Sequence, residues 1–201
     1  MKKQKNKYLW GSKMALKSKK TSHSFLNEKT VNYSEFKGQI ISSKEITQHD
    51  FSKLNIAIIG TDQDIATHLE RLCLHANQVK VFQNSPQYIL PKSDRQLNRL
   101  ISHPLLIKNR RLVSQRIKSL LSIRYLESQI QDPWLRHLLT PNRAQLPKNI
   151  LKSDSYYAAL QRENCHLEPW PLIKISPYSV QGIDGLYFYC DTIITTENIK
   201  C

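Results

Sequence analysis

Long hydrophobic runs and paired cysteines are both absent from this 201-residue sequence. No apolar run approaches the ~20 residues that a membrane-spanning helix needs, and the N-terminus lacks the apolar stretch of a secretory signal. The four cysteines lie far apart and form no C-x-x-C pair, so the sequence indicates neither a zinc site nor a disulfide framework. We therefore expect a cytoplasmic protein with reduced cysteines.

Motifs for hydrolytic and metal-dependent catalysis are absent as well. The sequence has no G-x-S-x-G nucleophile elbow and no evident pair of carboxylates, which leaves a hydrolase with little support. The seven histidines are scattered. Two of them, His68 and His75, fall on one expected helix but are too far apart along it to share a metal ion. We predict no metal site.

Charge is the first strong signal that is present, and it is unevenly distributed. The net charge is +14, and eight of the 30 basic residues but none of the 16 acidic residues lie in residues 1–20, which leaves +6 for residues 21–201. This lysine-rich segment could make weak contact with phosphates or an anionic membrane surface. We favour a solvated, disordered arm over residues 1–30, because no known nucleic-acid-binding pattern is present.

Residues 55–83 carry the clearest pattern of secondary structure. Residues 55–59 form a short apolar run that ends at Gly60, as in a strand buried on both faces of a parallel sheet. Apolar residues then recur at helical spacing, and residues 79–82 form a second run of β-branched and aromatic side chains. This order of strand, turn, helix and strand predicts the nucleotide-binding half of a Rossmann-type fold.

The turn before the helix is where a dinucleotide would bind, because its pyrophosphate rests on the helix N-terminus. The expected pattern is G-x-G-x-x-G/A, but the sequence reads Gly60, Thr61, Asp62 and keeps only the first glycine. A carboxylate at Asp62 would repel the phosphates unless it points away into water. We favour the alternative that Asp62 or Asp64 simply caps the helix.

The end of the second strand normally selects the cofactor. An acidic residue there binds a ribose hydroxyl, and an arginine accommodates the additional phosphate of NADP. This sequence has Gln83 and Asn84 at that point, and neither side chain does either task well.

The second half of the chain predicts additions to the Rossmann unit. Helices are expected over residues 94–131, 134–139 and 153–160. Two apolar β runs between residues 173 and 196 flank a polar turn, as in a hairpin that returns to the main sheet. The predicted class is α/β: a Rossmann-like, mostly parallel sheet within residues 31–201, with a helical insertion at about 94–160 and a C-terminal β-hairpin.

Five short motifs occur in order over residues 33–196. They are F-x-G (Phe36, Gly38), V-F-Q-R-[ST]-P (residues 81–86), D-P-x-L-R-x-x-L-T-P (residues 132–141), S-D-x-Y-Y-x-A-L (residues 153–160) and D-G before D-x-I-I (residues 184–194). As an ordered set they resemble the flavin-containing monooxygenases, specifically the Baeyer–Villiger type and its close bacterial relatives.

This resemblance implies that the chain corresponds to the second of two Rossmann domains. In that family the first domain binds FAD, the second binds NADPH, and the reduced flavin reacts with oxygen to oxygenate a ketone or a heteroatom. Residues 1–54 contain no G-x-G-x-x-G after a strand, so we expect the FAD site to be absent from this chain and to need a separate flavin-binding chain. The resemblance implies NADP and FAD as cofactors and a fragment or subunit that is inactive alone.

The functional positions of the family are altered in this sequence. The second glycine of the phosphate turn corresponds to Asp62, and the arginine that reads the 2′-phosphate of NADP corresponds to Asn84. The lysine near the cofactor matches Lys148, but the family's catalytic arginine matches Asn149, so no catalytic residue is predicted. The cofactor-binding positions implied by the resemblance are Gly60, Thr61, Asp62, Gln83, Asn84 and Lys148.

A second hypothesis follows from the same pattern, in which scaffold positions are kept while chemical positions change. The chain would then be a non-catalytic, degenerate descendant of the family. Its basic arm and helices would bind an acidic partner, a nucleic acid or a membrane surface.

Overall fold

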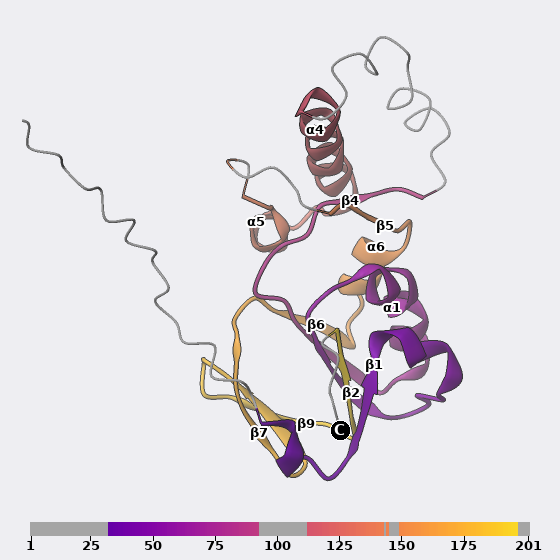
Figure 1. Cartoon of the computed structure of the whole chain (residues 1–201), viewed down its shortest axis with the longest axis vertical. Coiled ribbons are helices and arrows are strands. Elements are labelled where there is room, and N and C mark those ends of the chain that lie inside the picture. The colour runs from indigo at the N-terminus through magenta and orange to yellow at the C-terminus, as the bar shows by residue number, and fades with distance from the viewer. Residues whose placement is uncertain (1–31, 93–111, 143, 145–148, 197–201) are drawn as a thin grey trace, which may run out of the picture.

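A five-stranded, entirely parallel sheet forms the centre of the computed structural model, which describes residues 32–92, 112–142, 144 and 149–196 (Figure 1). In spatial order the strands are β1 (Gln39–Ser42), β10 (Thr192–Thr195), β2 (Asn55–Ile59), β3 (Gln78–Phe82) and β6 (Cys165–Glu168). The predicted α/β class with a Rossmann-like, mostly parallel sheet is confirmed. The strand at β6 was not predicted, because its sequence CHLE alternates over only four residues and contains no β-branched residue.

The two faces of this sheet are buried against different layers. Side chains alternate between the faces along a strand, so Ile56 and Ile58 of β2 point to one side and Ala57 to the other. The first side packs against helices α1 (Gln63–His75) and α6 (Tyr156–Leu160), and the second packs against a small antiparallel sheet. Burial on both faces explains why β2 reads as a continuous apolar run.

Helix α1 begins and ends as the sequence predicts. The apolar residues that recur at helical spacing form its buried side: Ile65, Ala66, Leu69, Leu72 and Cys73. Asp62 caps its N-terminus, and the side chain of Asn164 donates hydrogen bonds to the carbonyls of Cys73 and Ala76 at its C-terminus. The helix is therefore fixed at both ends against the sheet.

The helical segments of the second half lie above the sheet in Figure 1. They are α4 (Leu112–Gln129), α5 (Pro133–Leu139) and α6. Two short strands, β4 (Ile89–Leu90) and β5 (Leu151–Lys152), pair in parallel where the chain leaves and rejoins the Rossmann unit. Each of the three predicted helical segments therefore contains a helix. Residues 94–111, the first part of the first segment, lie outside the described residues.

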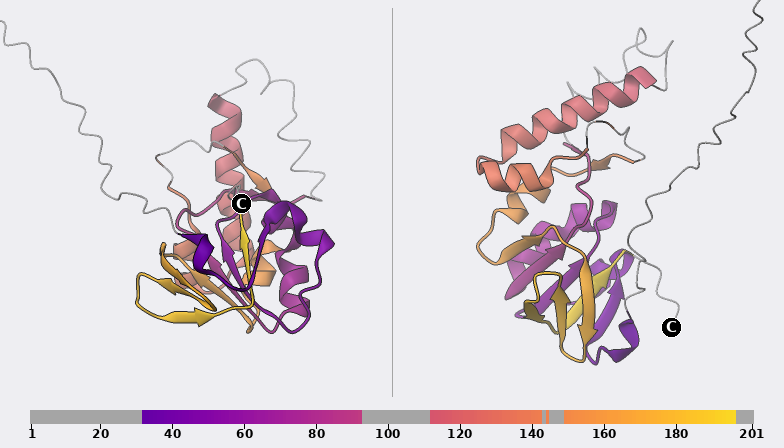
Figure 2. Two further views of the ribbon diagram at one scale, coloured as in Figure 1. Left: turned by 60° about the horizontal axis from the view of Figure 1, so that its bottom comes forward. Right: turned by 90° about the vertical axis from the view of Figure 1, so that its left-hand side faces the viewer.

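The predicted C-terminal hairpin is a three-stranded antiparallel sheet of β7 (Leu172–Ser176), β8 (Ser179–Gly182) and β9 (Tyr187–Tyr189). The second predicted β run divides at Cys190 and Asp191, so that β9 stays in this small sheet and β10 enters the main sheet. Figure 2 shows the small sheet lying against the main sheet. Two 3₁₀ turns, Tyr33–Glu35 and Ser43–Gln48, flank β1.

The cytoplasmic location and the N-terminal arm, both expected from the sequence, stay predictions. No helix in the described residues is long and apolar enough to cross a membrane, and this finding leaves the cellular location open. The domain boundary near residue 31 and the arm over residues 1–30 fall outside the described residues.

Candidate functional site

The turn between β2 and α1 is shaped by Gly60, which adopts a φ of +87°. A Cβ atom on Gly60 would lie 2.5 Å from the side-chain oxygen of Thr196, which follows β10. The Gly60 amide donates a hydrogen bond to the carbonyl of Phe82 over 2.9 Å. Backbone conformation and the contact with Thr196 both require glycine at this position.

Asp62 occupies the N-terminus of α1 with both of its carboxylate oxygens engaged. Oδ1 accepts a hydrogen bond from the amide of Ile65 over 2.9 Å, and Oδ2 accepts one from the hydroxyl of Ser43 over 2.5 Å. The side chain therefore does not point away into water. The sequence-based hypothesis that Asp62 or Asp64 caps the helix is confirmed for Asp62.

This arrangement does not fit the pyrophosphate of a dinucleotide. A phosphate at about 5 Å from the carboxylate, at an effective dielectric of about 20, would be repelled by roughly 3 kcal/mol. The helix N-terminus offers an anion only about 0.3–2 kcal/mol. The carboxylate also takes the Ile65 amide that a phosphate oxygen would use. The geometry of the turn is thus that of a capped helix.

Gln83, at the end of β3, is turned into the protein. Its side chain is 5% exposed, and its Oε1 accepts a hydrogen bond from the phenol of Tyr156 over 2.7 Å. Its Nε2 donates to the carbonyl of Ser85 over 3.2 Å. Burial raises the pKa of Tyr156 well above its ordinary value, so the phenol stays a donor at neutral pH. Gln83 therefore holds α6 against the sheet, and its side chain does not face a bound cofactor.

The other described positions implied by the resemblance lie in the turn or in exposed segments next to strands. Thr61 lies in the turn, and its hydroxyl oxygen is buried without a hydrogen-bond partner among the described residues. Asn84 is exposed in a bend just beyond β3, and Asn149 is exposed just before β5. Lys148 lies outside the described residues. The structure thus brings Gly60, Thr61 and Asp62 together in one turn and leaves Asn149 in a separate loop.

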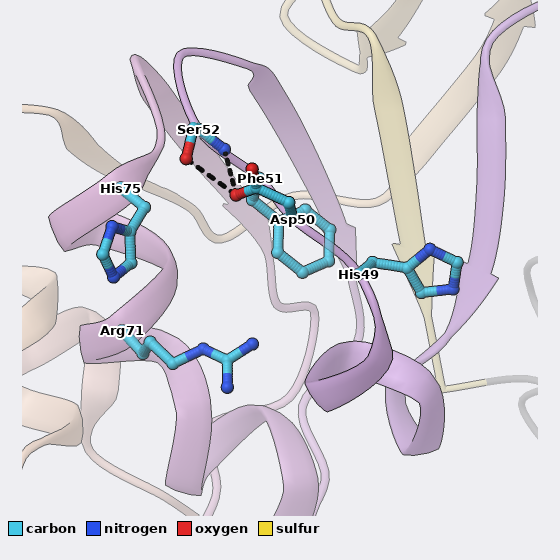
Figure 3. Close-up of a pocket in the computed structure, with 6 residues that line it drawn as sticks. All are labelled: His49, Asp50, Phe51, Ser52, Arg71 and His75. Carbon is cyan, nitrogen blue, oxygen red and sulfur yellow. Dashed lines mark hydrogen bonds between the residues drawn. The ribbon is translucent and has the colours of Figure 1, made fainter.

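A surface cavity of about 360 Å³ lies at the opposite end of α1 (Figure 3). It is lined by His49, Asp50, Phe51, Ser52, Arg71 and His75. Hydrogen bonds from the hydroxyl and the amide of Ser52 lower the pKa of the Asp50 carboxyl. No group of three or more potential metal ligands occurs in the described part of the chain, this cavity included.

Three residues that sequence reasoning missed help to shape the turn and the strand end beside it. Ser43, Thr196 and Tyr156 come from segments far from Gly60 in the sequence. The parallel strands β1, β2, β3 and β10 end at the same edge of the sheet, which is why the residues after them meet. A search for polar residues directly after each strand would have found Ser43 and Thr196.

Comparison with curated proteins gives relatives of one kind. In an alignment of 187 positions that covers 81% of the chain, the sequence is 27% identical to the FAD-binding monooxygenase ktnD of Aspergillus niger. Over 152 residues it is 28% identical to a Baeyer–Villiger monooxygenase of Pseudomonas aeruginosa. These alignments cover 31% and 29% of the two relatives, so the chain spans about a third of their length. No protein-family model matches the sequence.

Two similar solved structures are of the same kind. A steroid monooxygenase bound to NADP superimposes with a TM-score of 0.65 at 17% identity, over 82% of this chain and 42% of that one. Cyclohexanone monooxygenase in an open form superimposes with a TM-score of 0.63 at 15% identity, over 82% and 44% of the two chains. The fold defines a Rossmann-type domain of the kind found in flavoprotein monooxygenases. The predicted resemblance to the Baeyer–Villiger monooxygenases is confirmed.

Proposed function

We propose that this chain is a fragment or subunit of an FAD- and NADP-dependent monooxygenase of the Baeyer–Villiger type, and that it does not oxygenate a substrate alone. The observation that carries the proposal is the similarity to an FAD-binding monooxygenase over 81% of the chain. In such an enzyme FAD supplies the oxygen chemistry and NADPH the reducing equivalents. No amino-acid nucleophile or metal substitutes for that chemistry.

A separate flavin-binding chain is the partner that we propose. Among the described residues, large exposed hydrophobic side chains gather on and around the small antiparallel sheet: Trp170, Ile173, Tyr178, Ile183, Leu186, Tyr187 and Tyr189. Exposed apolar patches of this kind mark surfaces that bind other proteins. The patch therefore supports a partner, and the second contact that we propose is a weak one between residues 1–20 and an anionic surface.

Purified chain tests the proposal directly. We expect no flavin absorbance band and no oxidation of NADPH by the chain alone, because the flavin is supplied by the partner. Addition of the partner chain should give a complex that carries the flavin absorbance band. Flavin absorbance together with NADPH oxidation in the isolated chain would contradict the proposal.

A second candidate function is a non-catalytic binding module. The observation that favours it is the set of changed chemical positions, since Asp62 caps a helix, and Asn84 and Asn149 stand where the resemblance calls for arginine. Two of the described basic side chains of α4, Arg116 and Arg124, are exposed and available to an acidic surface. This function predicts affinity for heparin that falls steeply with salt concentration. Binding that is insensitive to salt would argue against it.

A further inference from the structure

We propose that the carboxylate of Asp62 takes the place of a dinucleotide's pyrophosphate at the N-terminus of α1, so that the turn of this chain is occupied by its own side chain and rejects NADP. The inference concerns this turn alone. It does not rest on the proposed function, and it holds with or without a flavin-binding partner.

The side chain of Asp62 is held in place by hydrogen bonds from two different segments. Oδ1 is held by the Ile65 amide of α1, and Oδ2 is held by Ser43, which follows β1 and is 2% exposed. A buried hydroxyl that donates to Oδ2 keeps the carboxylate over the helix terminus. Rotation of Asp62 away from the turn would leave the Ile65 amide without its cap and the Ser43 hydroxyl without its acceptor.

The end of the neighbouring strand β3 also lacks a side chain that would bind a 2′-phosphate. Gln83 is turned inward to Tyr156, and the residue after it, Asn84, is exposed and carries no charge. Neither residue therefore supplies a cation at this edge of the sheet to offset the charge of Asp62. A 2′-phosphate would find no guanidinium there.

A purely structural role for Asp62 makes a different prediction from the proposal. A cap needs only a hydrogen-bond acceptor, which asparagine supplies as well as aspartate. If Asp62 only caps the helix, Asp62→Asn leaves anion binding at the turn unchanged. If its charge excludes the pyrophosphate, the same variant stays folded and gains affinity for anions at the turn.

Asp132 provides a matched control. It caps α5 with two hydrogen bonds, from the amides of Trp134 and Leu135, as Asp62 caps α1. Asp132→Asn removes the same charge from a helix N-terminus that does not belong to the turn. Any general effect of lowering the negative charge of the protein appears in both variants.

Amide chemical shifts in a ¹⁵N NMR titration measure binding at the turn itself, with inorganic pyrophosphate and NADP⁺ as separate probes. In the natural chain we expect no saturable shift at Gly60, Thr61 or Ile65 with either probe. In Asp62→Asn we expect saturable shifts at these amides, with pyrophosphate bound at least about tenfold more tightly than in the natural chain and in Asp132→Asn. Asp62→Ser, which also carries a good capping side chain, should behave in the same way.

Two results would overturn the inference. One is saturable binding of NADP⁺ at the turn of the natural chain. The other is pyrophosphate affinity at the turn that is equal in the natural chain, Asp62→Asn and Asp62→Ser. Far-UV circular dichroism of each variant verifies that the helices are intact. Flavin content and NADPH oxidation do not enter this test, so its failure is distinct from failure of the proposed function.

Discussion

The phenol of Tyr156 donates a 2.7 Å hydrogen bond to the side-chain oxygen of Gln83, and both side chains are buried. The two residues come from α6 and from the end of β3, 73 positions apart in the sequence. The bond joins the insertion to the sheet at the strand end where a Rossmann domain usually reads its cofactor. The position at which other Rossmann domains recognise the cofactor therefore stabilises the tertiary structure of this chain.

Loss of this hydrogen bond should destabilise the fold. We expect Tyr156→Phe to lower the free energy of unfolding by about 1–3 kcal/mol, because the buried oxygen of Gln83 is left without a partner. Urea denaturation measures the change. In a double-mutant cycle, Gln83→Met combined with Tyr156→Phe should cost less than the sum of the single changes, and additive costs would contradict the coupling.

Alanine at Gly60 should be more costly than alanine at Gly185. Both glycines have a positive φ, but a Cβ atom at Gly60 meets the Thr196 side chain. A Cβ atom at Gly185 has no described heavy atom within 4 Å apart from those of Gly185 and its two chain neighbours. We expect Gly185→Ala to cost about 1 kcal/mol from backbone strain alone, and Gly60→Ala about 2–4 kcal/mol. Thermal or urea unfolding tests the order, and equal losses would show that the contact with Thr196 adds nothing.

The ion pair on the face of the main sheet towards β7–β9 should stabilise the protein only while both partners are present. Lys80 Nζ lies 3.2 Å from Glu168, and the two side chains are 14% and 12% exposed. We expect Glu168→Gln to cost about 2 kcal/mol, because it leaves a mostly buried ammonium group unpaired. The double variant Lys80→Met, Glu168→Leu should lie within about 1 kcal/mol of the natural chain in urea denaturation, and a cost as large as that of the single variant would contradict this account.

Alkaline pH should destabilise the fold. Burial raises the pKa of Cys190 to about 12, and it raises the pKa values of Tyr156 and Tyr157 above the ordinary phenol value. The unfolded chain releases these protons at lower pH than the folded chain. The stability contributed by Cys190 is therefore fully present below about pH 8.5 and is lost as the pH rises towards its folded pKa.

Urea denaturation at about pH 8 and about pH 10.5 measures this loss. The variant Cys190→Ala cannot release the thiol proton, so it should lose less stability than the natural chain over the same interval. Equal losses in the two proteins would mean that Cys190 does not contribute.

Much of the fold follows from local patterns in the sequence. The apolar run of β2, the helical spacing of α1 and the cap at Asp62 are signals from neighbouring residues, and each is found where it was predicted. The strand β6 has only a weak signal, an alternation over four residues, and it forms because its backbone pairs with β3 at one side of the sheet. The division of the last β run at Cys190 and Asp191 is likewise decided by pairing with two different sheets.

The sequence by itself determined the family resemblance, the loss of the second glycine at Asp62 and the absence of an arginine at Asn84. It left open whether the carboxylate points into water or onto the helix. Only the tertiary structure decided this, because the hydroxyl that fixes Asp62 belongs to Ser43, at the end of another strand. Chain segments distant in sequence meet where parallel strands end, and no local pattern records which side chains will face one another there.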